Sequence, residues 1–128
     1  MPTPDPERTD VEATESSGDL HQALLREVNE EIERLNGEWE LDGRDTVLCE
    51  CGHPNCLEQL DIAAAEYERV RRFPTRFLVK PNHVTGEEER IVEERYGYVV
   101  VEKVGPGAAI AIQRDPRRAS RREQAVRR

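Results

Sequence analysis

The eight residues Cys49–Cys56, with the sequence Cys-Glu-Cys-Gly-His-Pro-Asn-Cys, contain all three cysteines of this chain. Two thiolates one residue apart can turn toward the same point only where the backbone curls tightly, and Gly52 gives the backbone the freedom for that curl. Pro54 and Asn55 then favour a turn that returns the third cysteine to the first two. Three soft sulfur ligands in one loop favour zinc or an iron–sulfur cluster over magnesium or calcium. The loop therefore predicts a metal site.

A structural zinc ion takes four ligands, so a fourth must come from outside the three cysteines. The chain has three histidines, His21, His53 and His83. His83 follows a predicted strand, in a loop that begins at Pro81, and a ligand there would tie the cysteine loop to a sheet edge. His53 sits inside the cysteine loop, where its short tether points it outward. His53, water, a carboxylate or a ligand from a partner protein stay open as alternatives. The predicted metal ligands are Cys49, Cys51, Cys56 and His83.

The alternative to a metal site is a cluster of three free thiols. Cysteine behaves as a small apolar residue in protein cores, and alternate residues share one face of a strand. The sequence Gly-His-Pro-Asn, however, breaks any such strand directly after Cys51. Exposed thiols at this density are also prone to oxidation. A metal is the favoured interpretation, and a redox sensor with Cys49 or Cys51 as a reactive thiolate is retained as a lesser one.

The expected compartment bears on the same question. The N-terminus has no basic stretch followed by an apolar one, so no secretory signal is expected. The longest apolar run, Ala108–Ile112, is far too short to span a membrane. We therefore expect a cytoplasmic protein, in which thiols stay reduced. The odd number of cysteines also leaves one unpaired in any scheme of disulfides.

An amphipathic helix is predicted before the loop, over residues 19–36. Charged residues fill one face, and four aliphatic residues recur at every fourth position on the other: Leu20, Leu24, Val28 and Ile32. Asn36 and Gly37 form a typical helix stop. We expect the apolar face to pack on a sheet or on the same helix of a second copy. A homodimer through residues 19–36 is thus one arrangement that the pattern allows.

The rest of the chain predicts β-strands and one more helix. The expected strands cover residues 46–48, 57–62 and 76–80, the arms of a hairpin cover 90–95 and 98–104, and a helix covers 63–72. Tyr96 and Gly97 form the turn of this hairpin. Thr85 and Glu88 resemble a capping box, which leaves a helical turn open in place of the first arm. The predicted fold class is α+β: a small antiparallel sheet with two helices, stabilised by zinc, with disordered tails.

Composition divides the chain into a domain and two tails. Residues 1–18 contain three prolines and five acids against one arginine. Residues 114–128 contain seven arginines against two acids. Neither segment can bury enough apolar surface to offset its chain entropy, so both are predicted to be disordered. A single zinc-binding α+β domain is expected over residues 19–113.

Charge narrows the classes of function. The net charge of −8 disfavours a dedicated duplex-binding module, because such modules present a basic face. The Arg-rich tail is the one segment expected to contact nucleic acid, if any does. The acids at 87–89 and 93–94 predict a solvated face, since nothing implies their burial. The arginines of segment 69–76 predict ion pairs with acids of the same domain. No nucleotide-binding glycine pattern or catalytic triad is recognisable.

Two families share parts of this pattern. The C-x-C-G-x-x-x-C spacing of Cys49–Cys56 resembles the zinc knuckle that follows the catalytic domain of SET-type lysine methyltransferases. That resemblance covers only this loop and implies a metal-binding role for its cysteines. A longer stretch, from about Arg26 to Arg117, resembles a family of small uncharacterised actinobacterial proteins. The matching segments are Glu66–Arg71, Arg76–His83 and Val100–Lys103. The second resemblance supports His83 as a ligand and implies no activity.

The sequence thus predicts a non-catalytic zinc-binding domain, a regulatory or adaptor protein that acts through a protein partner. Zinc would add stability that a small core lacks. The alternative is a zinc-dependent hydrolase, in which an open metal position binds water and His53 or Glu50 assists it. The thiol redox sensor is a further alternative. No catalytic residue is predicted, and no membrane partner.

Overall fold

A computed structural model describes the backbone of residues 4–39, 44–84 and 88–119, and the side chains of residues 18–36, 44–84 and 88–119. In these ranges the chain forms three helices and five strands. Their order is α1 (Pro4–Trp39), β1 (Arg44–Leu48), β2 (Gln59–Ala63), α2 (Ala64–Arg71), β3 (Arg76–Val79), β4 (Glu89–Arg95), β5 (Tyr98–Lys103) and α3 (Pro106–Gln113). The predicted α+β class is confirmed. Helix α3 is an addition to the two helices that the sequence predicted.

The strands form two small antiparallel sheets. One pairs β1 with β2 and places Val47 opposite Leu60. The other has the order β3-β5-β4 and places Phe77 opposite Val101. The predicted hairpin is present as β4 and β5, and its turn includes Gly97 with a φ of 90°, which glycine adopts without strain. Antiparallel pairing is therefore as expected, but the strands divide between two sheets.

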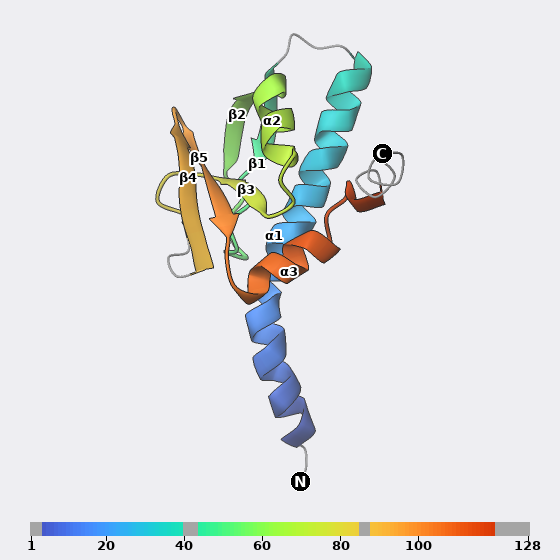
Figure 1. The fold of residues 1–128 in the computed structure, drawn as a ribbon, viewed down its shortest axis with the longest axis vertical. Coiled ribbons are helices and arrows are strands. Elements are labelled where there is room, and N and C mark those ends of the chain that lie inside the picture. The colour runs from blue at the N-terminus through green and yellow to red at the C-terminus, as the bar shows by residue number, and fades with distance from the viewer. Residues whose placement is uncertain (1–3, 40–43, 85–87, 120–128) are drawn as a thin grey trace, which may run out of the picture.

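The core lies between the sheets and the helices. In Figure 1, α1 runs along the long axis of the molecule, with the strands and α2 to one side and α3 crossing it. Strand β5 is buried along most of its length, since it is the centre of its sheet. The core side chains include Val47, Leu60, Ile62, Tyr67, Val70, Phe77, Leu78, Val100 and Val101, together with Cys49 and Cys51. The two cysteines thus lie at the edge of the apolar core.

The packed face of α1 is largely polar, although Ala23 and Leu25 are also buried and Ile32 packs against the core. This differs from the predicted packing of an apolar face on a sheet of the same chain. Much of the predicted apolar face is exposed: Leu20 at 38%, Leu24 at 54% and Val28 at 38%. The buried face instead carries Gln22, Arg26 and Asn29, each at 1% or less. The periodicity was misleading because each of these polar side chains has a specific buried partner, which offsets the cost of its desolvation.

Arg26 shows how such a residue is accommodated. Its guanidinium donates to the carbonyl of Pro74 at 2.6 Å and to that of Ala111 at 2.7 Å. It also lies 4.7 Å from the centre of the Phe77 ring, a distance at which a cation and an aromatic face attract each other. Arg26 thereby joins α1 to β3 and to α3, whose residue Ala111 is buried against it.

Charged residues elsewhere also pair within the domain. Arg69 contacts Glu93 at 2.5 Å and Arg76 contacts Glu102 at 2.7 Å, as predicted for this arginine-rich segment. Glu89 is a correction, because it was expected on a solvated face and is buried. It accepts a hydrogen bond from Gln22 at 2.6 Å, since α1 covers this end of β4.

The described chain extends on both sides of the predicted domain, residues 19–113. Helix α1 begins at Pro4, and the disorder expected for the two tails stays a prediction. Prolines in a first turn are compatible with this start, because their missing N–H groups have no partner there. In Figure 1 these first turns extend past α3. After α3, Asp115 is buried and Arg117 donates to Glu30 at 2.7 Å, so packing continues beyond residue 113.

The described helices differ from membrane-spanning helices. None of them combines the length and the apolar character that crossing a bilayer requires.

Candidate metal centre

The cysteine loop joins β1 to β2 and also hydrogen-bonds to β3 of the other sheet. It follows β1, and the backbone N–H of Cys49 still donates to Glu58 across the β1–β2 pair at 2.9 Å. One residue later the pairing partner changes, because the N–H of Glu50 donates to Leu78 of β3 at 2.7 Å. The loop therefore leaves one sheet and runs along the edge strand of the other.

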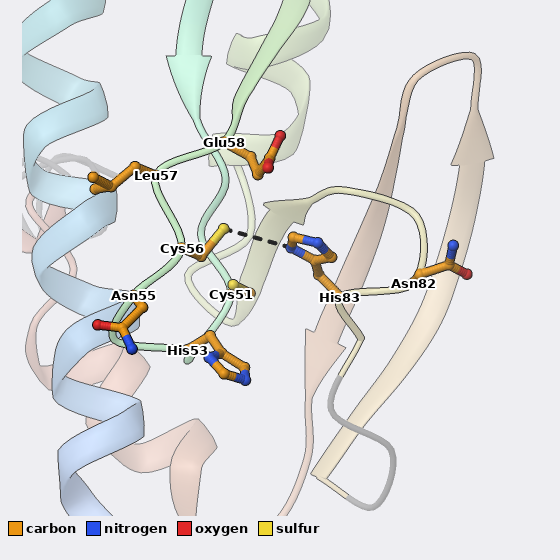
Figure 2. Close-up of a pocket in the computed structure, with 8 residues that line it drawn as sticks. All are labelled: Cys51, His53, Asn55, Cys56, Leu57, Glu58, Asn82 and His83. Carbon is orange, nitrogen blue, oxygen red and sulfur yellow. Dashed lines mark hydrogen bonds between the residues drawn. The ribbon is translucent and has the colours of Figure 1, made fainter.

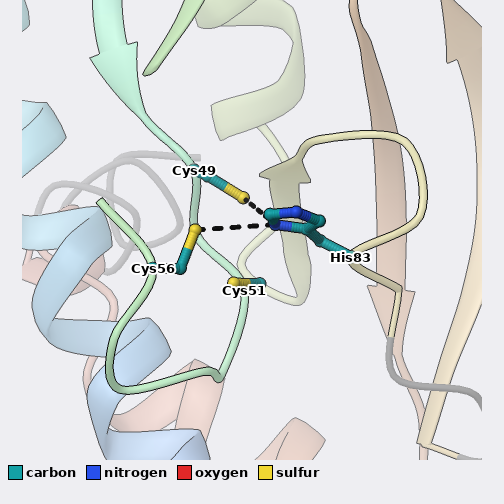
Figure 3. A group of neighbouring side chains, drawn as sticks. All are labelled: Cys49, Cys51, Cys56 and His83. Carbon is teal, nitrogen blue, oxygen red and sulfur yellow. Dashed lines mark hydrogen bonds between the residues drawn. The ribbon is translucent and has the colours of Figure 1, made fainter. Parts of the chain in front are cut away.

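Four potential metal ligands meet at this point. The sulfurs of Cys49, Cys51 and Cys56 and a ring nitrogen of His83 all lie within 4.8 Å of one another. Figure 3 shows the His83 ring directed at the cysteine sulfurs. The Nδ1 atom lies 3.5 Å from the sulfurs of both Cys49 and Cys56. The structure thus brings together the four residues that the sequence predicted as ligands.

The two nitrogen–sulfur separations fit a single tetrahedral ion. Zinc binds sulfur at about 2.3 Å and imidazole nitrogen at about 2.0–2.1 Å. With a tetrahedral angle between those bonds, sulfur and nitrogen are about 3.6 Å apart. The observed separation of 3.5 Å from Nδ1 to two sulfurs is close to this value. The donor set and its spacing are therefore compatible with one bound metal ion.

A tight turn after β3 presents His83. The N–H of His83 donates to the carbonyl of Lys80 at 3.0 Å, which closes the turn. Asn82 has a φ of 76°, a left-handed conformation that asparagine adopts more readily than most residues. The N–H of Lys80 donates to the sulfur of Cys49 at 3.2 Å. The same turn therefore supplies one ligand and hydrogen-bonds to another, as partners outside the ligand set commonly do in metal sites.

Burial makes two thiols of the loop, those of Cys49 and Cys51, poor acids. Cys49 and Cys51 are buried, and Cys56 is partly exposed. Desolvation raises the pKa of the Cys49 thiol to about 12, and it also raises the pKa of Cys51. The thiolate forms therefore require a compensating positive charge. A divalent ion between the four ligands supplies that charge, because a coordinating thiol is deprotonated outright.

Glu50, between the first two cysteines, points away from the metal ligands. Its carboxylate is fully buried and accepts hydrogen bonds from Asn29 at 2.7 Å and from the N–H of Leu78 at 2.9 Å, and it is paired with Arg71. Gln22 donates to its backbone carbonyl at 3.1 Å. The interpretation of Glu50 as a catalytic base is thus wrong, because its carboxylate is committed to the protein interior.

Arg71 completes this buried group. Its guanidinium lies 4.8 Å from the centre of the Tyr67 ring and donates to the carbonyl of Arg76 at 3.1 Å. It also lies 3.5 Å from Glu30 of α1. A fully buried charge is costly unless it is paired and hydrogen-bonded, and Arg71 is both.

A pocket of about 420 Å³ opens beside the metal ligands. Three of the four ligands line it, together with neighbouring polar groups and one apolar side chain (Figure 2). The residues that line it are Cys51, His53, Asn55, Cys56, Leu57, Glu58, Asn82 and His83. The metal centre is therefore next to a surface that a ligand can reach.

The other two histidines, of which His53 was the predicted alternative, lie outside the ligand group. His53 is exposed and lines the pocket, and His21 lies on α1. The residues that sequence reasoning missed are the supporting ones, Asn29 and Arg71 with Glu50. A signal for Asn29 was available in the sequence, because polar residues recur on one face of α1 at positions 22, 26 and 29.

Comparison with known proteins adds no identity. No protein-family model, no curated protein and no solved structure matches this chain. The resemblances stated from the sequence therefore stay predictions.

Proposed function

We propose that this chain is a non-catalytic, zinc-stabilised domain that acts through a protein partner as a regulatory or adaptor protein. The observation that carries the proposal is the convergence of three cysteine sulfurs and one histidine nitrogen within 4.8 Å. Three thiolates and one imidazole are a ligand set that structural zinc sites use.

The spacing of the ligands favours zinc over an iron–sulfur cluster. A cluster of several irons holds its thiolates farther apart than one ion does, because each thiolate binds a different iron. Here one nitrogen lies 3.5 Å from two different sulfurs, so these three atoms face a common point. Soft sulfur donors also disfavour magnesium and calcium.

The number of ligands supports a structural role over a catalytic one. Catalytic zinc sites keep one position for water, whereas four protein ligands close the tetrahedral shell. Glu50 is held by Arg71 and Asn29 and so is not free to act on a metal-bound water. We expect the protein to work in the cytoplasm, where the thiolates stay reduced.

The metal content of the purified protein tests this proposal. We expect one zinc per chain, measured by mass spectrometry of the metal, together with three thiols that a thiol reagent titrates only after the metal is removed. His83→Ala should lose zinc, and His83→Cys should retain it, because a fourth thiolate replaces the imidazole.

His53→Ala is the matched control, because His53 lies in the same region but outside the ligand group. It should keep its zinc and its stability. Protein without metal and with three freely titrated thiols would contradict the proposal. Zinc retained in full by a folded His83→Ala variant would contradict the closed site and favour an open, catalytic one.

A further inference from the structure

We propose that the pocket beside the metal centre binds a cationic nitrogen group, an ammonium or a guanidinium, such as a lysine or arginine side chain of a partner protein carries. This inference rests on the proposed zinc-binding function. It adds to that function a location and a chemistry for the partner.

The charge of the pocket is the first argument. A divalent ion bound by three thiolates and a neutral imidazole leaves one net negative charge at the centre. Glu58 adds a second negative charge on the pocket wall, and it is exposed, so its carboxylate is accessible. Among the described residues that line the pocket, none is a lysine or an arginine. The two negative charges would therefore attract an incoming cation, and no lysine or arginine of the described lining would repel it.

The hydrogen-bonding groups of the wall agree with this charge. The amide oxygens of Asn55 and Asn82 and the carboxylate of Glu58 are acceptors, and both ammonium and guanidinium groups are donors only. In the view of Figure 2, the His83 ring lies between Glu58 above and His53 below, with Asn82 to one side. Asn55 and Asn82 line the same pocket and lie on opposite sides of it in this view.

The pocket also suits the aliphatic part of a basic side chain. Its volume of about 420 Å³ lies within the range of small-ligand sites, roughly 300–1,000 Å³. Leu57 lines it and is 78% exposed, so its apolar surface is accessible to a ligand. Lysine and arginine place their methylene stems on such apolar surface and keep the charged end near polar groups. Phosphate groups, in contrast, would be repelled, which disfavours nucleic acid at this face.

Binding of a short basic peptide to the zinc-loaded protein tests the inference. The probe is a fluorescent Gly-Lys-Gly-Arg-Gly peptide, and the reference is Gly-Gln-Gly-Gln-Gly, both measured by fluorescence anisotropy. We expect the basic peptide alone to bind, with an affinity that falls as salt is added. Glu58→Gln should weaken binding roughly fivefold to tenfold, since it removes one charge-assisted contact.

Glu94→Gln is the matched control, because it removes one exposed acid from β4, away from the pocket. It should bind the basic peptide as the unmodified protein does. Equal binding of the two peptides, or unchanged binding by Glu58→Gln, would overturn the inference. Spermidine added as a competitor identifies the source of the cation: strong competition assigns the pocket to free polyamines, and weak competition assigns it to protein side chains.

The zinc content of every sample separates the two proposals. Protein without zinc would overturn the proposed function, whatever the peptides do. Zinc-loaded protein that does not distinguish the peptides would overturn only the cation pocket.

Discussion

The carboxylate of Glu50 receives donors from three separate parts of the fold. Asn29 belongs to α1, Arg71 ends α2 and Leu78 belongs to β3. Because Glu50 lies between two cysteines, these bonds fix the backbone that carries both sulfurs. A residue that touches no metal thus determines where two ligands point, and partners of this kind affect metal affinity about 10–100-fold.

Replacing Glu50 by alanine should therefore damage both stability and metal binding. The change removes the nearer of the two carboxylates beside the buried guanidinium of Arg71 and leaves only Glu30 at 3.5 Å, and breaking a buried pair costs about 3–5 kcal/mol. Urea unfolding of the zinc-loaded protein measures the loss. Glu50→Leu combined with Arg71→Met should recover part of it, because no unpaired charge remains. A single variant as stable as the unmodified protein would show that the pair contributes little.

The raised thiol pKa values predict that metal binding releases protons. Burial raises the pKa of the Cys49 thiol to about 12, so this thiol is protonated at neutral pH in the metal-free site. Coordination of the metal by the thiolate displaces that proton. Zinc affinity should consequently rise as pH increases from about 6 to 8. Calorimetric titrations in two buffers of different ionisation enthalpy give the number of protons released. Binding without proton release would contradict thiolate coordination.

At the scale of elements, α1 joins the other parts of the domain through polar side chains. Asn29 is its clearest example, since its amide donates to Leu48 at 2.9 Å and accepts from the N–H of Leu48 at 2.8 Å. The same side chain donates to Glu50. One asparagine thus hydrogen-bonds both to the backbone of the last residue of β1 and to the side chain of Glu50 in the cysteine loop. The aliphatic residues on the outward face of α1 make no comparable contribution to the core.

This arrangement predicts that Asn29→Ala destabilises the protein more than Leu24→Ala does. Asn29→Ala leaves buried partners unsatisfied, at a cost of about 1–3 kcal/mol. Leu24 is 54% exposed, and a surface substitution of this kind changes the free energy of unfolding by about 0.5 kcal/mol or less. Thermal or urea unfolding of both variants decides the order. The reverse order would mean that the leucine face is buried in solution, as it would be in the homodimer that the sequence allowed.

Local sequence signals predicted most elements because those signals act over a few residues. The hairpin of β4 and β5 follows from β-rich arms around Tyr96 and Gly97, and β3 ends before Pro81. The face of α1 that is buried could not be predicted, because it depends on hydrogen-bond partners distant in the sequence. Asn29, for example, donates to Leu48, which is 19 residues away. Helix α3 also escaped prediction, since its small residues have no marked amphipathic period.

The metal ligands were predictable for a similar reason. Three of them lie within eight residues, and the fourth follows a strand that ends at a proline. The pairing of Glu50 with Arg71 was not predictable, because a carboxylate beside two cysteines reads equally well as a ligand or a base. Only the packing of α1, α2 and β3 around it determines which way the carboxylate points.

At the scale of the whole molecule, the four candidate ligands come from both sheets. The cysteines lie in the loop between β1 and β2, and His83 follows the end of β3 in the other sheet. An ion bound by these four residues would hold together two sheets whose described strands share no backbone ladder. Asn36 of α1 also donates to Asp45 of β1 at 2.6 Å, and the carboxyl of Glu33 on α1 interacts with that of Asp45.

This carboxyl pair predicts a pH dependence of global stability. Burial and the neighbouring acids Asp45, Glu68 and Glu30 raise the pKa of Glu33 to about 8, from an ordinary value of 4.5. Above pH 4.5 the unfolded chain loses this proton while the folded protein keeps it, so stability falls from about pH 5 to pH 8. Glu33→Gln should flatten that decline and stabilise the protein at pH 8 but hardly at pH 4.5. Urea unfolding at several pH values measures it, and parallel profiles would contradict the assignment.

The uneven spacing of the four ligands along the chain also bears on the order in which the domain assembles. The three cysteines close a short loop, whereas His83 is 27 residues beyond Cys56, and shorter loops lose less entropy on closure. A chain emerging from the ribosome therefore completes the thiolate triad well before the last ligand exists. Zinc captured at that moment would act as an early nucleus, and the arrival of His83 would be the step that brings β3 onto it.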